Sequence, residues 1–263
     1  MLGMPASHTH PPPDLSIVIP VLNEAGKILQ DIQSAAEFCH DQGIVAEIVL
    51  SDDGSTDNSM EVARQARTGL PGGISLVVLT SDEHHGKGYA VRKGMLAANG
   101  TIVMFADSGG NIAWKFILGA IVLIAGGTCQ IVQGSRQLPE SNILVRQPLP
   151  RRILSILFQG FARLILPIPG QLTDTQCGFK FYSREVAKEL FQECALNGFL
   201  FDLDIILMAQ RRGFTIREIP IDWRCDRDSR LRLRDNIYQM AKELRILYNL
   251  FGGRARNRLH RNK

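Results

Sequence analysis

Residues 15–24 have the sequence LSIVIPVLNE, and residues 46–57 have the sequence AEIVLSDDGSTD. Each segment is a short apolar run, rich in β-branched residues, that ends in polar side chains. This pattern is typical of a buried parallel strand followed by a loop. Residues 25–41, between the two segments, carry apolar side chains at helical spacing. The region is therefore predicted to form a strand, a helix and a second strand lying parallel to the first.

The same alternation continues further along the chain. Helices are predicted over residues 56–67 and 88–99, and strands over residues 74–79 and 101–105. Four successive strand–helix units predict an α/β fold, with a mostly parallel sheet flanked by helices. Ligands of such sheets bind beyond the carboxyl ends of the strands, which is where the polar clusters of this sequence fall.

The second half of the chain is less regular. It predicts strands over residues 129–134 and 216–223, helices over 199–210 and 236–251, and a polar loop over 139–150. Residues 174–182 change from polar to apolar, and two further segments, 114–127 and 151–166, are strongly apolar. We expect one domain over residues 15–235, a disordered tail over 1–14, and an amphipathic helix with a basic tail over 236–263.

The composition narrows the class of protein. The chain has 263 residues, of which 45% are hydrophobic and 21% charged, as in ordinary globular proteins and unlike disordered, collagen-like or coiled-coil chains. Its five cysteines are scattered without a C-x-x-C pair, which argues against a disulfide framework or a zinc site. No segment reaches the roughly 18–20 apolar residues of a membrane span, and the N-terminus lacks the pattern of a secretory signal.

The positive charge is concentrated at one end. The net charge is +4 overall, but residues 224–263 carry 12 Lys and Arg against 4 Asp and Glu. Such a segment suits an anionic partner, namely a phospholipid surface, a phosphorylated substrate or nucleic acid. No aromatic platform or recognition motif accompanies it, so we expect no nucleic-acid partner. A solvated, disordered end is the alternative interpretation.

Taken singly, the polar clusters are weak signals. Asp52-Asp53-Gly54 could accept hydrogen bonds from a base or ribose, but D-G-S turns are common. Gly86-Lys87-Gly88 suits an anion, although the P-loop spacing is absent. The loop that starts at Asp107 could bind a metal or form a simple turn. The pair His84-His85 is interpreted as a polar loop, and Cys177 as a packing residue.

The order of the motifs is more specific than any one of them. P-V-L-N-E (20–24), D-D-G-S-T-D (52–57), G-K-G-x-A-x-R-x-G (86–94) and F-A-D-S (105–108) each follow a predicted strand or open the next helix. With G-S-R (134–136) and D-T-Q-C-G-F-K (174–180), this series resembles the family 2 inverting glycosyltransferases of the GT-A (Rossmann-like) fold. Within that family it is similar to the dolichyl-phosphate glucosyltransferases and other polyprenyl-phosphate sugar synthases.

The resemblance implies a role for each matching position. Those near the nucleotide or its sugar are Pro20, Leu22, Asn23, Glu24, Asp52, Asp53, Gly54, Lys87, Arg92 and Ser108. Those implied in catalysis are Asp107, Asp174, Arg136 and Arg230, with Asp107 also holding the metal. Those on the acceptor side are Thr175, Gln176, Gly178 and Lys180.

One position departs from the family pattern. The family's D-x-D motif holds Mg²⁺ or Mn²⁺ against the sugar diphosphate, and its second Asp is replaced here by Gly109. A divalent cation prefers several oxygen ligands, so the loss of one carboxylate weakens the predicted metal site. Arg136 and Arg230 could then take over part of the stabilisation of the leaving group.

The resemblance implies transfer of a hexose from a nucleotide-sugar to a polyprenyl phosphate with inversion. UDP-glucose is favoured over GDP-mannose as the donor. Such an enzyme would lie peripherally on the cytoplasmic face of a membrane, attracted by its basic end and by residues 114–127 and 151–166, unless these two segments are core. The alternatives are a soluble family 2 transferase with a glycan or small-molecule acceptor, and a catalytically silent nucleotide-sugar binding protein.

Overall fold

The computed structural model describes residues 11–225 and 233–252. Its centre is a seven-stranded sheet with the strand order β3-β2-β1-β4-β7-β5-β8. The strands are β1 (Leu15–Val21), β2 (Ala46–Asp52), β3 (Ile74–Leu79), β4 (Ile102–Ala106), β5 (Ile131–Ser135), β7 (Phe179–Ser183) and β8 (Ile216–Pro220). The predicted α/β sheet is confirmed.

The direction of the strands decides which loops meet. β1, β2, β3 and β4 are parallel, β7 is antiparallel to both β4 and β5, and β5 is parallel to β8. The first residue of β7, Phe179, therefore lies opposite Ala106, the last residue of β4. The segment before β7 thus reaches the same edge of the sheet as the loops that follow β1, β2, β4 and β5.

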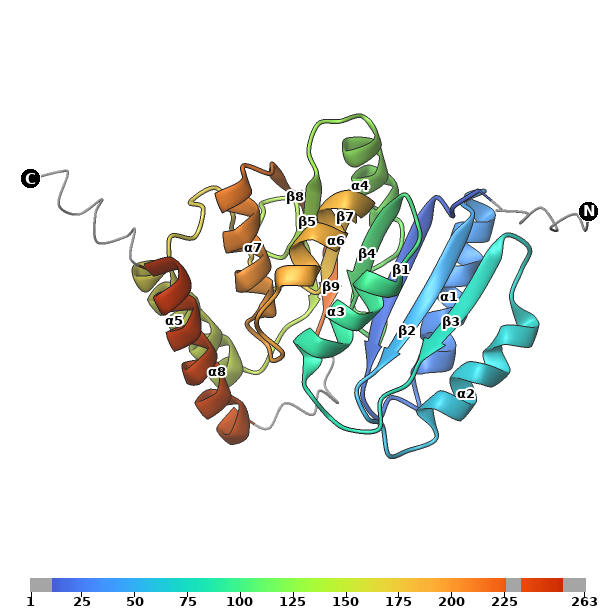
Figure 1. The fold of residues 1–263 in the computed structure, drawn as a ribbon, viewed down its shortest axis with the longest axis horizontal. Helices are drawn as coiled ribbons and strands as arrows, with labels where there is room; N and C mark the ends of the chain where they lie inside the picture. Colours follow the sequence, from blue (N-terminus) through green and yellow to red (C-terminus); the bar gives the residue numbers. More distant parts are fainter. Residues whose placement is uncertain (1–10, 226–232, 253–263) are drawn as a thin grey trace, which may run out of the picture.

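Helices cover both faces of the sheet (Figure 1). On one face α1 (Ile28–Asp41), α2 (Ser59–Ala66) and α4 (Phe116–Ala125) share a core with one side of the strands. On the other face α3 (Lys87–Ala97), α6 (Arg184–Glu193) and α7 (Phe201–Arg212) share a second core with the opposite side. Neighbouring residues of β1, such as Ile17 and Val18, belong to different cores because side chains alternate along a strand.

Two more helices lie at one end of the molecule. α5 (Leu149–Ile165) and α8 (Leu233–Leu247, continued by a π-helical turn at Tyr248–Gly252) both lie at the left end of the view in Figure 1. Leu244, Leu247 and Phe251 pack into the core that contains α3, α6 and α7. The predicted C-terminal helix is thus part of the folded unit.

The structure differs from the sequence prediction in three places. The predicted loop over residues 139–150 contains a short strand, β6 (Asn142–Val145), paired with β9 (Asp222–Arg224). The strand predicted over 216–223 is consequently divided, with β8 pairing with β5 and β9 pairing with β6. Helix α6 was not predicted, although its buried residues Val186, Ala187, Leu190 and Phe191 have helical spacing.

No helix among the described residues is long and apolar enough to cross a bilayer. Three regions of the sequence predictions lie outside the described residues: most of the N-terminal tail (1–10), the segment containing Arg230 (226–232), and the basic tail (253–263).

Candidate functional site

The loop after β1 and the loop after β2 are joined into one surface. Asn23 has a positive φ of 57°, and its Oδ1 accepts hydrogen bonds from the backbone N–H groups of Thr56 (2.7 Å) and Asp57 (3.1 Å). In return, Ser55 Oγ accepts from Asn23 N (2.8 Å), and Ser59 Oγ accepts from Glu24 N (2.8 Å). The predicted nucleotide-side residues 22–24 and 52–54 are therefore brought together by a network that fixes the backbone.

Asp52 and Asp53 shape these loops through backbone amides. Asp52 accepts from the N–H groups of Gly54 and Ser55, while Asp53 accepts from those of His85 (2.8 Å) and Gly86 (2.9 Å). Both carboxylates are buried, and His84 Nδ1 lies 2.8 Å from Asp53. Because Asp53 bridges the loop after β2 to the start of α3, it also sets where Lys87 begins that helix.

Asp107 lies at the middle of the edge, directly after β4. Its Oδ1 lies 2.7 Å from Lys87 Nζ, and its backbone N–H donates to the Gly178 carbonyl (3.0 Å). A Cβ added at Gly178 would fall 2.1 Å from the Asp107 carboxylate, so only glycine leaves room for this side chain. Burial would lower the pKa of Lys87, but the adjacent Asp107 outweighs it and raises that pKa, so the lysine stays protonated.

Gly109, which stands where the family pattern has its second aspartate, has a backbone conformation that favours glycine. Gly109 has φ +94°, and its N–H donates to Asp31 Oδ2 of α1 at 2.8 Å. Residues with a side chain rarely adopt such a φ. The backbone here is therefore arranged for glycine and is anchored to a buried carboxylate on α1.

Arg136 and Asp174 form a bidentate ion pair at the far side of the edge. Arg136 Nε and Nη2 donate to Asp174 Oδ2 (2.6 Å) and Oδ1 (2.8 Å), and the Arg136 backbone N–H donates to Oδ2 as well. The guanidinium also stacks over the Trp223 ring at 5.3 Å. Burial opposes ionisation of Asp174, but Arg136 overcomes it and lowers the Asp174 pKa. Asp174 is fully buried, whereas 21% of the Arg136 side chain is exposed, so Asp174 orients an arginine that remains partly open to solvent.

A buried ion pair supports the loop that precedes β7. Lys180 Nζ lies 2.5 Å from Asp202 Oδ1 and donates to the Thr175 carbonyl at 2.8 Å. Both charged side chains are buried, and burial raises the Asp202 pKa against the opposing effect of Lys180. In this structure Lys180 is therefore a buried residue that holds the backbone at Thr175, and its acceptor-side role stays a prediction. Gln176, which is partly exposed, donates its backbone N–H to Asp174 Oδ1 (3.3 Å).

Some predicted residues take other positions. The Arg92 guanidinium donates to the Cys194 carbonyl at 2.8 Å, which ties α3 to the loop before α7. Pro20 lies within β1 opposite Ser51, while Leu22 is partly exposed after the strand. The Ser108 carbonyl accepts from Asn111 Nδ2 (3.1 Å). Arg230 lies outside the described residues, so its role stays a prediction.

Three acidic residues that shape the site were not among the predicted site residues. Asp31 anchors Gly109, Asp202 pairs with Lys180, and Glu218 accepts hydrogen bonds from the backbone of Thr173 and Asp174. Asp31 carried a usable signal, since it occupies a core-facing position of an amphipathic helix. A carboxylate there needs a partner, although the sequence could not say which one.

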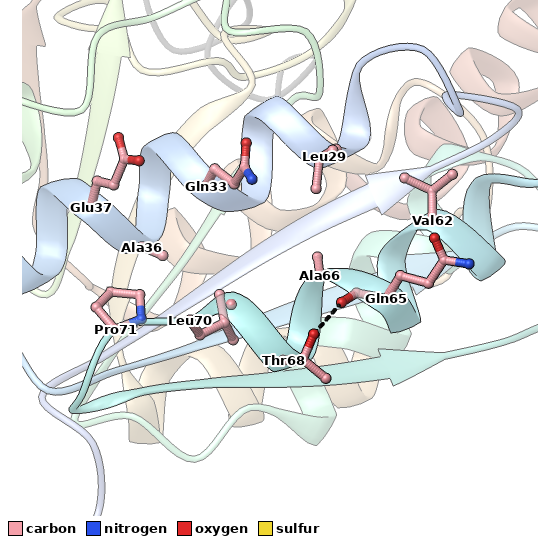
Figure 2. A pocket seen from close by; sticks show the side chains of 11 residues that line it. Leu29, Gln33, Ala36, Glu37, Val62, Gln65, Ala66, Thr68, Leu70 and Pro71 are labelled. Atoms are coloured by element: carbon pink, nitrogen blue, oxygen red, sulfur yellow. Dashed lines mark hydrogen bonds between the residues drawn. The ribbon is translucent and has the colours of Figure 1, made fainter.

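A separate surface hollow lies between α1 and α2 (Figure 2). It is lined by residues such as Leu29, Gln33, Glu37 and Val62. None of the predicted site residues contributes to it. The hollow is therefore separate from the carboxyl edge of the sheet, where those residues lie.

This fold and edge define a GT-A type glycosyltransferase. Among solved structures, glucosyl-3-phosphoglycerate synthase from Mycobacterium tuberculosis, in complex with Mn²⁺, UDP and its product, matches with a TM-score of 0.65. That match has 20% identity and covers 92% of this chain and 80% of the other. The same synthase has also been solved with Mg²⁺ and UDP, and it matches there with a TM-score of 0.65.

The glycosyl transferase family 2 model matches residues 16–191, and the chain belongs to that family. The yeast Saccharomyces cerevisiae has a dolichyl-phosphate beta-glucosyltransferase that is 32% identical over 254 residues, or 89% of this chain and 73% of the relative. The Dictyostelium discoideum enzyme of the same name is 28% identical over 88% of this chain and 72% of the relative. The predicted family, fold and enzyme class, an inverting glycosyltransferase, are confirmed.

The predicted Mg²⁺ or Mn²⁺ has support at the level of the fold, because structural neighbours contain these ions beside UDP. The side chains of the described residues do not form a metal cage. Asp107 is the single carboxylate of the motif and is already paired with Lys87. Across residues 11–225 and 233–252, no group of three or more His, Cys, Asp or Glu side chains is arranged to hold a metal. The described residues therefore do not fit a divalent cation held by protein side chains alone.

Proposed function

We propose that this enzyme transfers glucose from UDP-glucose to a polyprenyl phosphate on the cytoplasmic face of a membrane. The observation that carries the proposal is the similarity to dolichyl-phosphate beta-glucosyltransferases over most of both chains. The edge of the sheet supports it with one exposed cation on each side of Asp107, at Lys87 and at Arg136.

The chemistry requires positioning more than acid–base catalysis. A phosphate monoester is largely ionised near neutral pH, because its second pKa is about 6, and it is already a nucleophile. One phosphate oxygen attacks the anomeric carbon from the side opposite the nucleoside diphosphate. The bond to the leaving diphosphate oxygen then breaks, and the configuration inverts. The protein must align the two phosphate groups and stabilise the departing charge.

Different residues of the edge would bind the donor and the acceptor. The loops containing Asn23, Asp52 and Asp53 would hold the nucleoside, and Lys87 would hold the diphosphate next to Asp107. Arg136, oriented by Asp174, would bind an anionic oxygen on the acceptor side. Because Asp174 is buried and both its oxygens accept hydrogen bonds from Arg136, it serves as a positioning residue and not as a base.

Helix α5 supports a membrane-bound acceptor. Its exposed apolar residues recur at helical spacing along one face: Leu149, Ile153, Leu154, Ile156, Leu157, Phe161 and Leu164. Two of its polar residues contact the protein instead, as Arg163 donates to the Leu172 carbonyl (2.5 Å) and Gln159 accepts from Gln137 (3.1 Å). A lipid surface fits a helix that turns its apolar face outward and carries Arg151 and Arg152 on its first turn.

Helix α4 is packed differently, although it is more apolar. It buries Ile117, Ala120 and Ile124 against the sheet, and leaves Leu118 and Val122 exposed. Of the two apolar segments singled out in the sequence, residues 116–125 therefore contribute mainly to the core. The proposed membrane surface consists of α5, together with the basic end of the chain.

A transfer assay tests the proposal. The full chain is mixed with liposomes that contain polyprenyl phosphate and with radiolabelled UDP-glucose, UDP-galactose, GDP-mannose or GDP-glucose, and the lipid is extracted. We expect label in the organic phase with UDP-glucose. Efficient transfer to a water-soluble glycan or small molecule but not to lipid would favour a soluble transferase. Donor binding without transfer to any acceptor would indicate a silent binding protein.

The membrane surface has its own test. Flotation with liposomes containing about 30% anionic lipid should carry the wild-type chain upward, and Ile156→Ser with Leu164→Ser should weaken this clearly. Each exposed large apolar side chain that enters the bilayer contributes about 1.5–3 kcal/mol. The matched control is Leu118→Ser with Val122→Ser on α4, which should float like wild type. Equal flotation of both double variants would contradict a docking role for α5.

A further inference from the structure

Lys87 lies on the donor side of the site, beside Asp107. The family pattern leads us to expect a divalent metal ion there, held between two carboxylates. Lys87 Nζ contacts Asp107 at 2.7 Å, and Gly109 occupies the position of the second carboxylate. Two carboxylates with one divalent cation have no net charge, and neither has Asp107 with Lys87. The electrostatic balance of the metal site is thus reproduced by two side chains.

We infer that Lys87 is the fixed cation of the donor site and binds the nucleoside diphosphate directly, so that donor binding does not require a divalent metal. This inference rests on the proposed function, because it assigns a ligand to the same site. A cation that accompanies the donor would be held chiefly by the phosphates of the donor itself.

The position of Lys87 is unusually well fixed for a lysine. It is the first residue of α3 and stands between two glycines that pack against the loop before α7. A Cβ at Gly86 would lie 2.6 Å from the Asn197 carbonyl oxygen, and one at Gly88 would lie 2.7 Å from that of Leu196. Its side chain remains 23% exposed. The ammonium group can therefore keep its contact with Asp107 and still meet an incoming phosphate oxygen.

The carboxylates around Lys87 are paired with basic side chains, so they attract a free divalent cation only weakly. Asp107 pairs with Lys87, Asp174 pairs with Arg136, and Asp202 pairs with Lys180. Each of these three carboxylates thus has a basic partner. A metal site made of protein side chains normally needs surplus negative charge to repay the dehydration of the ion.

The inference is tested by calorimetric titration of the full chain with UDP and, separately, with GDP. Each titration is done once in EDTA, which removes divalent metal, and once in the presence of Mg²⁺ or Mn²⁺. We expect the wild type to bind one nucleotide in EDTA with a Kd within about threefold of the value in metal. Lys87→Met should weaken binding in EDTA by about tenfold or more, because a charge-assisted hydrogen bond is lost.

The matched control is Lys93→Met on the same helix. The Lys93 ammonium donates to the Thr80 carbonyl at 2.5 Å and is not part of the site, so its removal should leave the Kd unchanged. Thermal unfolding shows whether each variant is folded. If Lys87→Met does not fold, Lys87→Arg provides the test, since it keeps the charge and should retain binding in EDTA.

Nucleotide binding by the wild type only in the presence of metal would overturn the inference, as would a folded Lys87→Met that binds like wild type in EDTA. The transfer assay separates the two proposals. Metal-dependent binding together with glucose transfer leaves the proposed function standing and rejects the inference. Absence of binding to either nucleotide under every condition rejects both.

Discussion

The two sides of the site hold their carboxylates in different ways. On the side of β1 and β2, Asp52 and Asp53 accept hydrogen bonds mainly from backbone N–H groups. From β4 onward, Asp107 and Asp174 are instead paired with the side chains of Lys87 and Arg136. The first arrangement shapes loops, and the second orients cations toward the space where an anionic ligand would bind.

This difference has an energetic consequence. A carboxylate bound by amides keeps its hydrogen bonds when a neighbouring side chain is changed. A buried carboxylate that depends on one arginine loses most of its stabilisation when that arginine is removed. Substitutions that break the ion pairs of Asp107 and Asp174 should therefore affect stability and activity more than substitutions at the amide-bound Asp53.

The largest effect is expected for Arg136→Met. It leaves Asp174 buried without its partner, which should cost about 3–5 kcal/mol of folding stability near neutral pH and abolish transfer. Arg136 lowers the Asp174 pKa, whereas burial alone would raise it. The unfolded chains of the two proteins bind this proton alike, so the difference in stability depends on the pKa of Asp174 in the two folded states. The destabilisation should therefore begin to shrink above about pH 4, as the buried carboxyl group of the folded variant takes up a proton, and should vanish as the pH falls through the lowered pKa of the wild type.

Urea unfolding of wild type and Arg136→Met between pH 3 and pH 8 measures this dependence. Arg163→Met, which removes the bond to the Leu172 carbonyl on the edge of the same region, serves as the control arginine. A difference in stability between Arg136→Met and wild type that does not change with pH would contradict the role of the ion pair.

Gly178→Ala should have the next largest effect. The added Cβ would overlap the Asp107 carboxylate, so Asp107 must rotate away from Lys87, and we expect transfer to fall by about tenfold or more with a loss of about 1–3 kcal/mol in stability. Gly170→Ala is the matched control, because nothing lies within 4 Å of its added Cβ. Normal activity of Gly178→Ala would show that the placement of Asp107 is not critical.

Asp53→Asn should have a moderate effect. Asparagine keeps one acceptor oxygen but turns an NH₂ group toward the N–H groups of His85 and Gly86, which should cost about 1–3 kcal/mol and weaken nucleotide binding. His84→Ala removes only an exposed partner of the same carboxylate and should cost less than about 1 kcal/mol. Denaturant unfolding measures the stability of the two variants, and nucleotide titration measures their binding. Equal losses in Asp53→Asn and His84→Ala would argue that the contact of Asp53 with His84 matters more than its hydrogen bonds from backbone amides.

Gly109→Asp should have the smallest effect. The φ of +94° at this position is unfavourable for a residue with a side chain, so we expect a loss of about 1 kcal/mol and no gain in metal-dependent transfer. Unfolding and the transfer assay with and without Mg²⁺ measure both. A more active, metal-requiring variant would show that the loop still accepts the second carboxylate.

Much of the fold could be predicted from local patterns. The first four strands and the helices between them were predicted because their periodicities switch clearly between those of strand and helix. β6 was missed because it is a strand of four residues that pairs with the distant β9, and the residues on both sides of it are polar residues and prolines typical of a loop. The motifs also identified Asp107, Asp174 and Lys87, but the sequence did not indicate that each has an oppositely charged partner.

The apolar segments 114–127 and 151–166 also show what could not be predicted from sequence. Both had the composition of buried or interfacial helices, and the structure packs α4 against the sheet while α5 turns seven large apolar residues outward. Composition reports how apolar a helix is. The direction in which its apolar face points depends on what the rest of the chain places beside it.

The family and the α/β architecture could be predicted from the sequence alone, as could the loops that gather at the carboxyl edge of the sheet, because alternation and motif order are local properties of the chain. Only the tertiary structure decided that Lys87 meets Asp107, that Arg136 is oriented by a buried Asp174, and that Gly109 is held by Asp31. These contacts join residues from 20 to 78 positions apart, and the reversed direction of β7 brings the last of the loops to the common edge.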